Sequence, residues 1–353
     1  MNRVRRRVAV RLCLALLWLF RHTPLKRLAV RTEKTTRFQS TEAYIADRIS
    51  QVPEYEALFS PFTSFRGKVV AELGCSVGYL LDAFRRREDF SAIGIDIDPT
   101  ALAFGRETYG DRITFVQSAA TAIPLPSESV DVLYSIDTVE HLNPPREIFL
   151  ECARILRPGG VFLVHFDPWW GPVGAHLEDI IVFPWPHVLF SMDTLLTAAA
   201  EVYESPEYIP ACYWFDPQTG DRRANPYRDQ TRWGDYLNHL TVRGFRDLLK
   251  TLPFEVVHFE KRGFGGNRFP LARHLSALAQ LPRLDEFFTR TIFCVLKKPV
   301  GATAERLSPP SPQADPPGKM LAESWWGIGA GSRSTGVRPE ANGDSRRPAV
   351  RRG

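Results

Sequence analysis

Short apolar runs alternate with amphipathic segments through the middle of the chain. The apolar runs have the pattern of buried strands at 68–73, 91–98, 113–118, 129–137, 160–166, 254–262 and 290–298. Helical periodicity falls between them, at 41–51, 53–60, 78–87, 99–109, 144–156 and 241–251, with partly helical residues at 268–288. This alternation predicts an α/β fold, with an open, mostly parallel seven-stranded sheet covered by helices on both faces.

One long segment, residues 167–240, interrupts the alternation after the fifth strand. It is rich in Trp, Pro, Tyr and Asp and is too long for a passive loop, so we expect a lid or a subdomain. Its large aromatic residues have two possible roles: they wall an apolar ligand pocket, or they form a small core of the insertion's own. These residues are Trp169, Trp170, Phe183, Trp185 and Phe190.

The N-terminal segment, residues 1–37, is strongly basic, with eleven Lys or Arg and one acid. Its longest apolar run has nine residues, whereas a membrane-spanning helix needs roughly 20. No small-residue cleavage site follows, which argues against a signal peptide. Arg3, Arg7 and Arg11 share one helical face, so we expect an interfacial helix with peripheral membrane contact through residues 3–31. The alternative is a helix that packs on the domain.

The charge of the chain is unevenly distributed. Residues 38–298 hold 26 basic and 34 acidic residues, whereas residues 299–353 are basic, rich in Pro, Gly, Ser and Ala, and predicted to be disordered. An acidic centre argues against a nucleic-acid partner, which requires clustered basic charge. The five cysteines form no CxxC pair, which predicts reduced thiols and a cytoplasmic protein, with the N-terminal segment touching the inner membrane surface.

The first buried strand runs into a glycine turn with an acid at its entrance, "ELGCSVG" at 72–78. The turn lacks the third glycine of a dinucleotide fold and the Lys-Ser/Thr of a P-loop. Glu72 would repel a pyrophosphate but would favour a cationic ligand. Gly74 and Gly78 have no Cβ and let a ligand approach the backbone. In an open parallel sheet, ligands bind beyond the carboxyl ends of the strands, where this turn lies.

Four motifs occur in order along residues 65–166. They are "VVAELGCSVGYL", "IGIDID", "VQSAATAIPLPSESVDVLYSIDTVEHL" and "LRPGGVFLV". Together they resemble the class I S-adenosylmethionine-dependent methyltransferases, a Rossmann-like family, and the "EHL" is common in one large subgroup. The resemblance implies S-adenosylmethionine as cofactor and a methyltransferase domain over residues 38–298, with the insertion at about 167–240.

The resemblance also implies which residues contact the cofactor. Glu72 would orient its amino-acid end, and Asp96 would hold both ribose hydroxyls. Many family members carry Gly-Asp-Ala after the third strand, and that Asp binds adenine. Here the acid is missing, and Ser118 or the backbone near Ala119 would substitute for it. The full set of expected contacts is Glu72, Gly74, Gly78, Asp96, Ile97, Ser118, Ala119 and Asp137.

Methyl transfer needs alignment of donor and acceptor more than it needs a base. The candidate catalytic residues, Asp137, His141 and His165, lie at or just after the ends of the fourth and fifth strands. Each has a structural alternative: Asp137 as a helix cap, and the two histidines as packed, hydrogen-bonded side chains.

Two further histidines, His176 and His187, lie in the insertion and are acceptor-side candidates, near Glu178 and Asp179. The eleven-residue separation of the two histidines fits no short metal motif, so we predict no metal site.

"NPP" at 143–145 resembles the motif of adenine and glutamine methylating enzymes but lies six residues too late. We expect Asn143 to cap a helix with Pro144 at its first position. This placement excludes nucleobase and glutamine methylation.

The sequence therefore predicts methyl transfer from S-adenosylmethionine to a small or lipophilic acceptor, at oxygen. A lipid-like acceptor would suit both the membrane-seeking N-terminal segment and an apolar pocket. The alternative is a non-catalytic binding or scaffold protein with a degenerate methyltransferase fold, which the missing acid at Ala119 favours. A nicotinamide oxidoreductase is disfavoured because the third glycine is absent.

Overall fold

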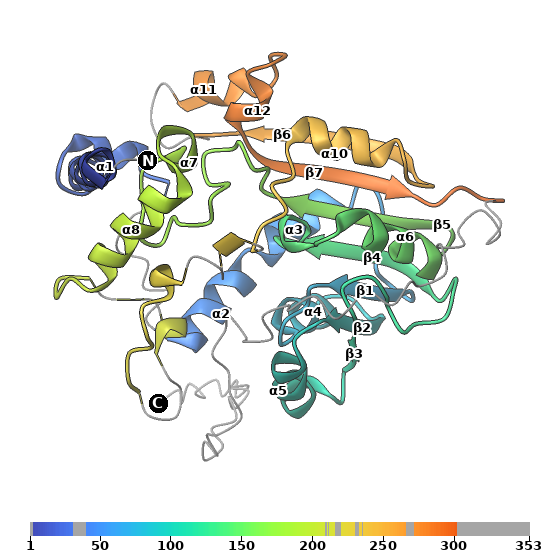
Figure 1. Cartoon of the computed structure of the whole chain (residues 1–353). Helices are drawn as coiled ribbons and strands as arrows, with labels where there is room; N and C mark the ends of the chain where they lie inside the picture. Colours follow the sequence, from blue (N-terminus) through green and yellow to red (C-terminus); the bar gives the residue numbers. More distant parts are fainter. Residues whose placement is uncertain are drawn as a thin grey trace, which may run out of the picture.

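The apolar runs of the middle region form one seven-stranded sheet in the order β3-β2-β1-β4-β5-β7-β6 (Figure 1). In the computed structural model the described residues are 3–30, 40–208, 210, 212–215, 220–229, 233–234, 236–265 and 272–301. All pairs from β3 to β5 are parallel, and β7 pairs antiparallel with both β5 and β6. The strands are β1 Val69–Leu73, β2 Ser91–Asp96, β3 Ile113–Gln117, β4 Val130–Ile136, β5 Leu156–Phe166, β6 Glu255–Gly263 and β7 Thr289–Lys297.

Helices cover the sheet as the periodicity predicts. Those of the sheet region are α2 Thr41–Ser50, α3 Val52–Phe59, α4 Tyr79–Arg85, α5 Pro99–Tyr109, α6 Pro145–Ile155, α10 Val242–Leu249, α11 Ala272–Leu278 and α12 Asp285–Phe288, together with the short 3-10 turn η3 Val139–His141. The N-terminal segment and the insertion contain α1 Arg3–His22, η1 Pro24–Leu28, α7 Pro186–Leu189, α8 Met192–Tyr203, η4 Cys212–Trp214 and η5 Pro226–Arg228.

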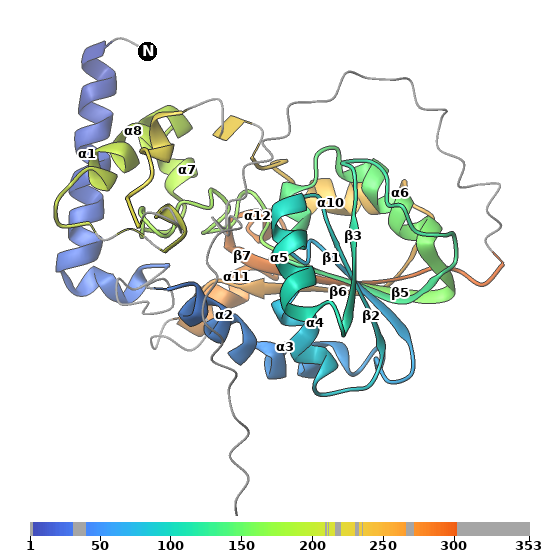
Figure 2. The same cartoon turned by 90° about the horizontal axis from the view of Figure 1, so that it is seen from below.

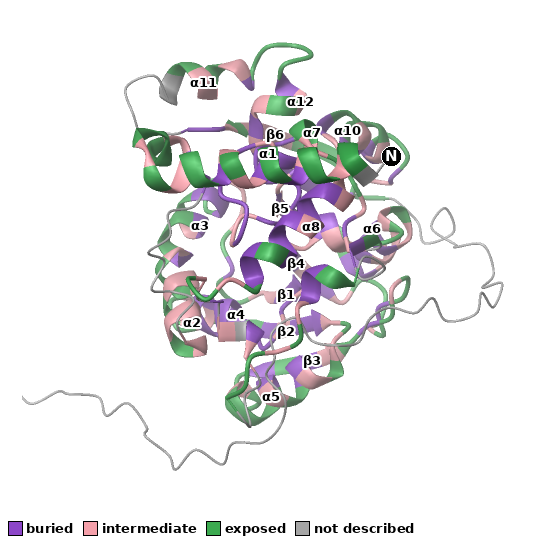
Figure 3. Cartoon of the chain, turned by 60° about the vertical axis from the view of Figure 1, so that its left-hand side comes forward, coloured by how far each residue is buried: buried purple, intermediate pink, exposed green. Residues whose placement is uncertain are grey.

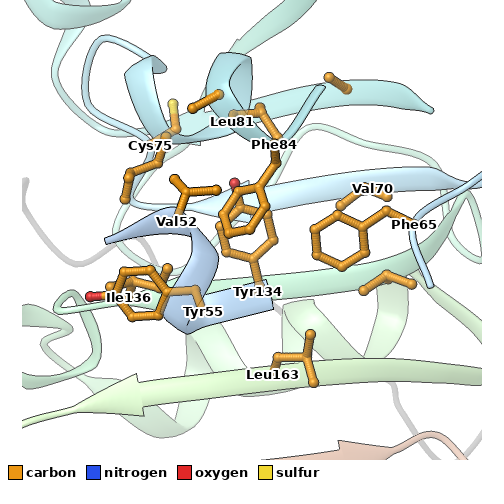
Figure 4. Close-up of a cluster of buried hydrophobic side chains, with 14 of the residues drawn as sticks. Val52, Tyr55, Phe65, Val70, Cys75, Leu81, Phe84, Tyr134, Ile136 and Leu163 are labelled. Atoms are coloured by element: carbon orange, nitrogen blue, oxygen red, sulfur yellow. The ribbon is translucent and has the colours of Figure 1, made fainter. Parts of the chain in front are cut away.

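Two hydrophobic cores lie on opposite faces of the sheet and confirm the predicted three-layer α/β architecture. On one face, Val70, Tyr134 and Leu163 of the strands pack with Tyr55 of α3 and Phe84 of α4, as Figure 4 shows. The other face buries strand residues against α6 and α10, with Phe149 and Phe245 at its centre. Because both faces are buried, the parallel strands read as nearly continuous apolar runs.

Two local predictions near α6 were wrong. The fifth strand was expected to begin at Gly160, but β5 begins at Leu156 and includes the "RPGG" turn. Its pairing with β4 jumps from Leu156 to Val161, a bulge that a short strand prediction misses. The helix cap is also displaced by one residue: Pro144 occupies the N-cap position and no side chain caps α6, so Asn143 is not its cap.

The insertion and the N-terminal helix pack together on one side of the sheet (Figure 2). Helix α1 lies along α8, and its buried residues Val10, Cys13 and Leu17 join the core of the insertion. The guanidinium of Arg6 donates to Asp193 and Thr197 on α8. The inner face of α1 therefore packs on the domain, as the alternative prediction for the N-terminal segment stated.

The outer face of α1 is exposed to solvent (Figure 3). It carries an exposed stripe of Val4, Val8, Leu12, Trp18 and Leu19, whose spacing places these residues opposite the buried ones. Among the residues that the structure describes, no helix is long and apolar enough to cross a membrane. The predicted disordered tail from residue 302 onward lies outside these residues.

Candidate functional site

The glycine turn lies at the point where the strand order reverses. Strand β1 is flanked by β2 on one side and β4 on the other, so the chain leaves β1 and β4 in opposite directions along the sheet. The antiparallel strand β7 points away from α8 in Figure 1, so the carboxyl ends of the parallel strands face the insertion. The residues that the sequence analysis selected at these strand ends therefore share one edge.

Glu72 is a buried carboxyl group, 3% exposed, near the end of β1. Burial raises the pKa of Glu72 to about 8, and the nearby Tyr134 hydroxyl and Arg48 guanidinium offset only part of this effect. Its Oε2 atom has no hydrogen-bond partner among the described residues. A buried carboxyl oxygen without a partner is costly, so this atom fits a ligand that brings a cationic donor.

Gly74 has the backbone geometry that the turn requires. Its φ is +80°, and a Cβ built there would lie 2.2 Å from Oγ1 of Thr138. Gly78 has a φ of +87°, and a Cβ there would lie 2.8 Å from the Phe115 ring. A side chain at either position would be strained and would push on the neighbouring strand ends. The turn therefore keeps its backbone close to β3 and to the loop after β4 only because both residues are glycine.

Asp96 at the end of β2 is fixed by the backbone around it. Its Oδ2 accepts from the Ser76 N–H at 2.7 Å, and its Oδ1 accepts from the Asp98 N–H at 2.9 Å. Burial raises the pKa of Asp96, and these backbone donors oppose that shift. Each carboxylate oxygen keeps a lone pair for another donor, so Asp96 can accept from two ligand hydroxyls. Beside it, the Ile97 side chain is 45% exposed and offers an apolar surface.

At the end of β3, where the acid is missing, the backbone N–H groups are bonded within the fold. Ser118 is buried, and its N–H donates to the Asp96 carbonyl at 2.9 Å. The Ala119 N–H donates to the Ala122 carbonyl at 2.9 Å. That N–H is already engaged, and as a donor it could not accept from an amino group as the missing acid would.

Asp137 adopts a left-handed backbone conformation, with φ 53°, directly after β4. Its Oδ2 accepts from Nη1 of Arg48 at 3.0 Å, and its Oδ1 lies 3.2 Å from Nδ1 of His165. Burial alone would raise the pKa of Asp137, but Arg48 and His165 hold it below its ordinary value. The turn η3 has no side-chain cap bond, so the structure does not support the reading of Asp137 as a helix cap.

Arg48 is a site residue that the sequence analysis missed. It lies on α2, and its side chain is 12% exposed. The only signal in the sequence is its position one helical turn after Tyr44, on the half-buried face of the predicted helix. A buried arginine requires a carboxylate partner, but nothing in the sequence indicates that this partner is Asp137.

The predicted catalytic histidines lie in two different environments. His165 faces Asp137, and its ring meets that of Tyr55 edge-on at 5.4 Å. His141 lies on the insertion side, where its Nδ1 is 3.1 Å from the Tyr236 carbonyl. Burial lowers the pKa of His141 to about 3. A carbonyl only accepts, so Nδ1 of the neutral ring carries the proton.

The structure brings only one of the two insertion histidines to this edge. The His176 ring lies 5.1 Å from the His141 ring, and its Nε2 is 3.7 Å from Oε1 of Glu140. His187 instead packs against Trp169, with ring centroids 4.6 Å apart.

The aromatic residues of the insertion separate into two groups. Phe183 is fully buried in the insertion's own core, and Phe190 packs against that core. Trp185 packs against Phe264 and Phe288 near the end of the sheet. For Phe183 and Phe190 the structure supports the small-core reading, whereas Trp185 packs on residues outside the insertion. The tryptophans nearest β5, Trp169 and the 36% exposed Trp170, are the aromatic residues that remain at the strand ends.

Taken together, the strand ends hold three features: Glu72 has a buried carboxyl group with one oxygen unpartnered among the described residues, Gly74 has no room for a Cβ, and Asp96 has a carboxylate that can accept two more hydrogen bonds. S-adenosylmethionine has an ammonium group, a sulfonium and a ribose with two free hydroxyls. The ammonium matches Glu72, and the two hydroxyls match Asp96. The residues present therefore fit this cofactor.

Comparisons with known proteins agree with this chemistry. Residues 71–164 match the family model described as a methyltransferase domain. An uncharacterized methyltransferase of Mycobacterium ulcerans is 32% identical over 114 residues, which cover 32% of this chain and 44% of the relative. A probable S-adenosylmethionine-dependent methyltransferase of Mycolicibacterium smegmatis is 39% identical over 102 residues, covering 28% of this chain and 37% of the relative. The chain thus spans less than half the length of these curated relatives.

Solved structures align with much of this chain at low sequence identity and with TM-scores below 0.5. An S-adenosylmethionine-dependent methyltransferase from Mesorhizobium loti aligns with 70% of this chain and 99% of its own, at 18% identity and a TM-score of 0.42. A geranyl diphosphate C-methyltransferase from Streptomyces coelicolor, solved with S-adenosyl-L-homocysteine, aligns with 70% of this chain and 76% of its own, at 11% identity and a TM-score of 0.42.

The segment 71–164 is therefore similar to a methyltransferase domain, and one of its relatives is described as S-adenosylmethionine-dependent. Its membership of the subgroup with "EHL" stays a prediction.

Proposed function

We propose that the protein transfers a methyl group from S-adenosylmethionine to a small or lipophilic acceptor, at oxygen. The observation that carries the proposal is the presence of two carboxyl groups at the ends of adjacent strands. Glu72 is buried with an unpartnered oxygen, and Asp96 is fixed by two backbone N–H groups. This arrangement suits an amino-acid nucleoside with a cationic head, and the matched family segment spans both residues.

The reactivity comes from the sulfonium of the cofactor, and the chain contributes position and charge. Arg48 and His165 hold Asp137 as a carboxylate at the end of β4. An ionised Asp137 can accept from the cofactor's ammonium or from an acceptor hydroxyl, but it has no proton to donate. We assign it an orienting role, because a group held so strongly as an anion is a weak base.

A lipophilic acceptor is favoured by two surfaces. Trp169 and Trp170 follow the end of β5 closely along the chain, and their rings lie 6.3 Å apart. The outer face of α1 presents Val8, Leu12 and Trp18 to solvent. Incubation of the full chain with methyl-labelled cofactor and a lipid extract tests this choice. Label in the organic phase is expected, and label confined to water-soluble products would exclude a lipid acceptor.

The competing function is that of a non-catalytic binding or scaffold protein with a degenerate methyltransferase fold. Its support is Ala119, which replaces an acid and whose N–H is already bonded to Ala122. Calorimetry separates the two functions from each other. Binding of both S-adenosylmethionine and its demethylated product, followed by turnover with the extract, supports the enzyme. Absence of binding at millimolar cofactor supports the scaffold.

The contribution of Asp96 can be measured against a neighbouring carboxylate. Asp96→Ala removes the acceptor for the ribose hydroxyls, and we expect cofactor affinity to fall about 10- to 100-fold, as for a lost hydrogen bond to a charged group. Asp98→Ala is the matched control, because Asp98 caps α5 through the N–H groups of Thr100 and Ala101. That variant should lose about 1 kcal/mol of stability and keep its affinity. Equal losses of affinity in both variants would contradict the role of Asp96.

We also propose that the outer face of α1 contacts an anionic membrane surface. The exposed apolar stripe, from Val4 to Leu19, is flanked by exposed Arg5 and Arg7 and includes Arg11. Basic residues beside an apolar stripe bind anionic headgroups while the apolar side chains enter the interface. The protein would then act as a cytoplasmic enzyme held at the inner membrane surface, near a lipid-like acceptor.

Vesicle binding tests this membrane contact. Leu12→Asp places an acid in the stripe, and we expect at least about tenfold weaker binding to vesicles containing phosphatidylglycerol, from lost burial and added repulsion. Leu189→Asp on α7 is the control, because Leu189 is 58% exposed and Leu12 is 59% exposed. Sedimentation of the full chain with vesicles measures both. Equal binding to pure phosphatidylcholine vesicles, or an equal effect of the two substitutions, would contradict the proposal.

A further inference from the structure

Three polar side chains outside the cofactor residues converge where the insertion packs on the end of β4. Glu140 and His141 belong to η3, and His176 comes from the insertion. One potential ligand atom from each of these residues lies within 4.8 Å of the other two. None of the three has a part in the cofactor contacts described above.

The ring of His141 presents its Nε2 as a lone pair. Its Nδ1 donates to the Tyr236 carbonyl at 3.1 Å, which leaves Nε2 unprotonated in the neutral ring. A histidine whose Nδ1–H is held by a backbone carbonyl is the usual arrangement of a metal-binding imidazole, because the hydrogen bond fixes both the tautomer and the ring orientation.

Glu140 is buried, and one oxygen of its carboxyl group has no partner among the residues that the structure describes. The residue is 4% exposed, and its Oε2 has no hydrogen-bond partner within the described part of the chain. Its Oε1 lies 3.7 Å from Nε2 of His176, which is too long for a hydrogen bond. A buried carboxyl group must be either protonated or paired with a cation. A cation shared with the two imidazoles would supply that pairing.

The backbone holds these ligands in position before any cation binds. The Asn238 side chain donates to the carbonyls of Val139 at 2.7 Å and Leu142 at 2.8 Å, and its N–H donates to the Glu140 carbonyl at 2.9 Å. His176 has a φ of 51°, a left-handed conformation that costs energy in a residue with a Cβ. Backbone strain that surrounding bonds maintain is common at functional sites.

We propose that Glu140, His141 and His176 bind a divalent cation of the zinc class. Two imidazoles and one carboxylate suit Zn²⁺ and its borderline neighbours better than Mg²⁺ or Ca²⁺, which prefer oxygen ligands. Ligand atoms around a tetrahedral zinc ion are roughly 3.4 Å apart, since each is about 2.1 Å from the metal. The Glu140–His176 pair is already close to that separation, and small side-chain rotations bring in His141.

Three protein ligands leave one position open, as in catalytic rather than structural zinc sites. This part of the inference rests on the proposed function: the open position takes the acceptor's oxygen. The bound hydroxyl loses its proton to water, and the oxygen forms a bond to the methyl carbon. The carbon–sulfur bond of the sulfonium breaks at the same time and leaves a neutral thioether. The cation thereby makes the acceptor oxygen a better nucleophile.

Metal titration of the full chain tests the site itself. After chelator treatment, calorimetry with Zn²⁺ should show one tight site per chain in the presence of a phosphine reductant. Glu140→Gln, which keeps the side-chain shape, and His176→Ala should each weaken that site at least about 100-fold, since even outer-shell partners cost 10- to 100-fold. His258→Ala is the control, because His258 and Glu260 form a histidine–carboxylate pair on β6 outside the cluster.

A second probe separates this site from the cysteines. Co²⁺ in place of Zn²⁺ should give visible bands of a tetrahedral nitrogen and oxygen site without the near-ultraviolet charge transfer of a thiolate. Loss of these bands in His176→Ala supports the assignment. A wild-type chain that binds Zn²⁺ no more tightly than millimolar, or variants that bind as tightly as wild type, would overturn it. Retained S-adenosylmethionine affinity shows that a variant is folded.

The two proposals fail in distinguishable ways. If Zn²⁺ binds to the three residues and S-adenosylmethionine does not bind, the metal site stands and the proposed function falls. If the cofactor binds, Zn²⁺ binds and removal of the metal leaves methyl transfer to the lipid extract unchanged, the link to the acceptor is wrong.

Discussion

Gly74→Ala is expected to weaken S-adenosylmethionine binding on the order of 100-fold or more. The new methyl group would lie 2.2 Å from Oγ1, 2.4 Å from Cγ2 and 2.8 Å from Cβ of Thr138. Rotation of the Thr138 side chain moves the first two atoms but leaves its Cβ in place. The loop that follows β4 must therefore shift away from the turn, and Asp137 shifts with it. Calorimetry with the cofactor measures the loss.

Gly67→Ala is the matched control for this substitution. Gly67 has a φ of +71°, close to that of Gly74, but a Cβ built there meets nothing within 4 Å. Both variants lose the same backbone freedom, which costs about 1–2 kcal/mol of stability. Only Gly74→Ala should lose the cofactor as well. A double variant, Gly74→Ala with Thr138→Gly, should recover part of the affinity. Equal affinity in the two single variants would contradict the close-approach role of Gly74.

Glu72→Gln is expected to weaken cofactor binding about 10- to 100-fold while making the free protein more stable at neutral pH. The substitution keeps the shape of the side chain but removes the negative charge that would meet the ammonium. It also removes a group whose ionisation the fold opposes. A purely structural carboxyl would show no such combination of weaker binding and higher stability.

The pH dependence of binding follows from the raised pKa of Glu72. Burial raises this pKa from its ordinary 4.5 to about 8, with Tyr134 and Arg48 lowering it in part and Asp96 adding to it. The folded protein therefore favours the neutral acid, and the stability that Glu72 contributes is fully present below pH 4.5 and lost as pH rises toward 8. An ammonium ligand needs the carboxylate, so cofactor affinity should rise with pH up to about 8 and then level off.

Calorimetry in buffers of different ionisation enthalpy measures this linkage. Wild-type protein should release a proton on binding S-adenosylmethionine between roughly pH 6 and 8, and Glu72→Gln should not. Thermal unfolding at pH 7 should show a higher midpoint for the variant. If wild-type binding is independent of pH over this range, the cofactor's ammonium does not meet Glu72.

The positions of the candidate cofactor residues in the fold were largely predictable from the sequence. Glu72 and Asp96 lie at the ends of apolar runs, and the strands end where those runs end. Gly74 lies in a turn whose residues are recognisable within a few positions of the strand. The same local rules failed at β5, because the bulge beside Leu156 depends on pairing with β4. They failed again at Asn143, where Pro144 takes the N-cap position instead.

The contacts on the insertion side of the strand ends were not predictable in the same way. Arg48 of α2 forms an ion pair with Asp137, which follows β4. No local sequence pattern predicts this ion pair. Glu140 and His141 form a cluster with His176 only because the insertion folds back over the carboxyl edge. The metal prediction was made from the spacing of His176 and His187, and the structure places these two residues in separate environments.

The sequence by itself determined the order of strands and helices, the position of the glycine turn, and the placement of Glu72 and Asp96 at strand ends. Each of these features depends on neighbouring residues. Only the tertiary structure decided that Arg48 holds Asp137, that His176 meets Glu140, and that α1 buries one face in the insertion and exposes the other. These contacts join segments far apart along the chain. Their energies depend on how the layers pack, and packing is a property of the whole fold rather than of any one stretch.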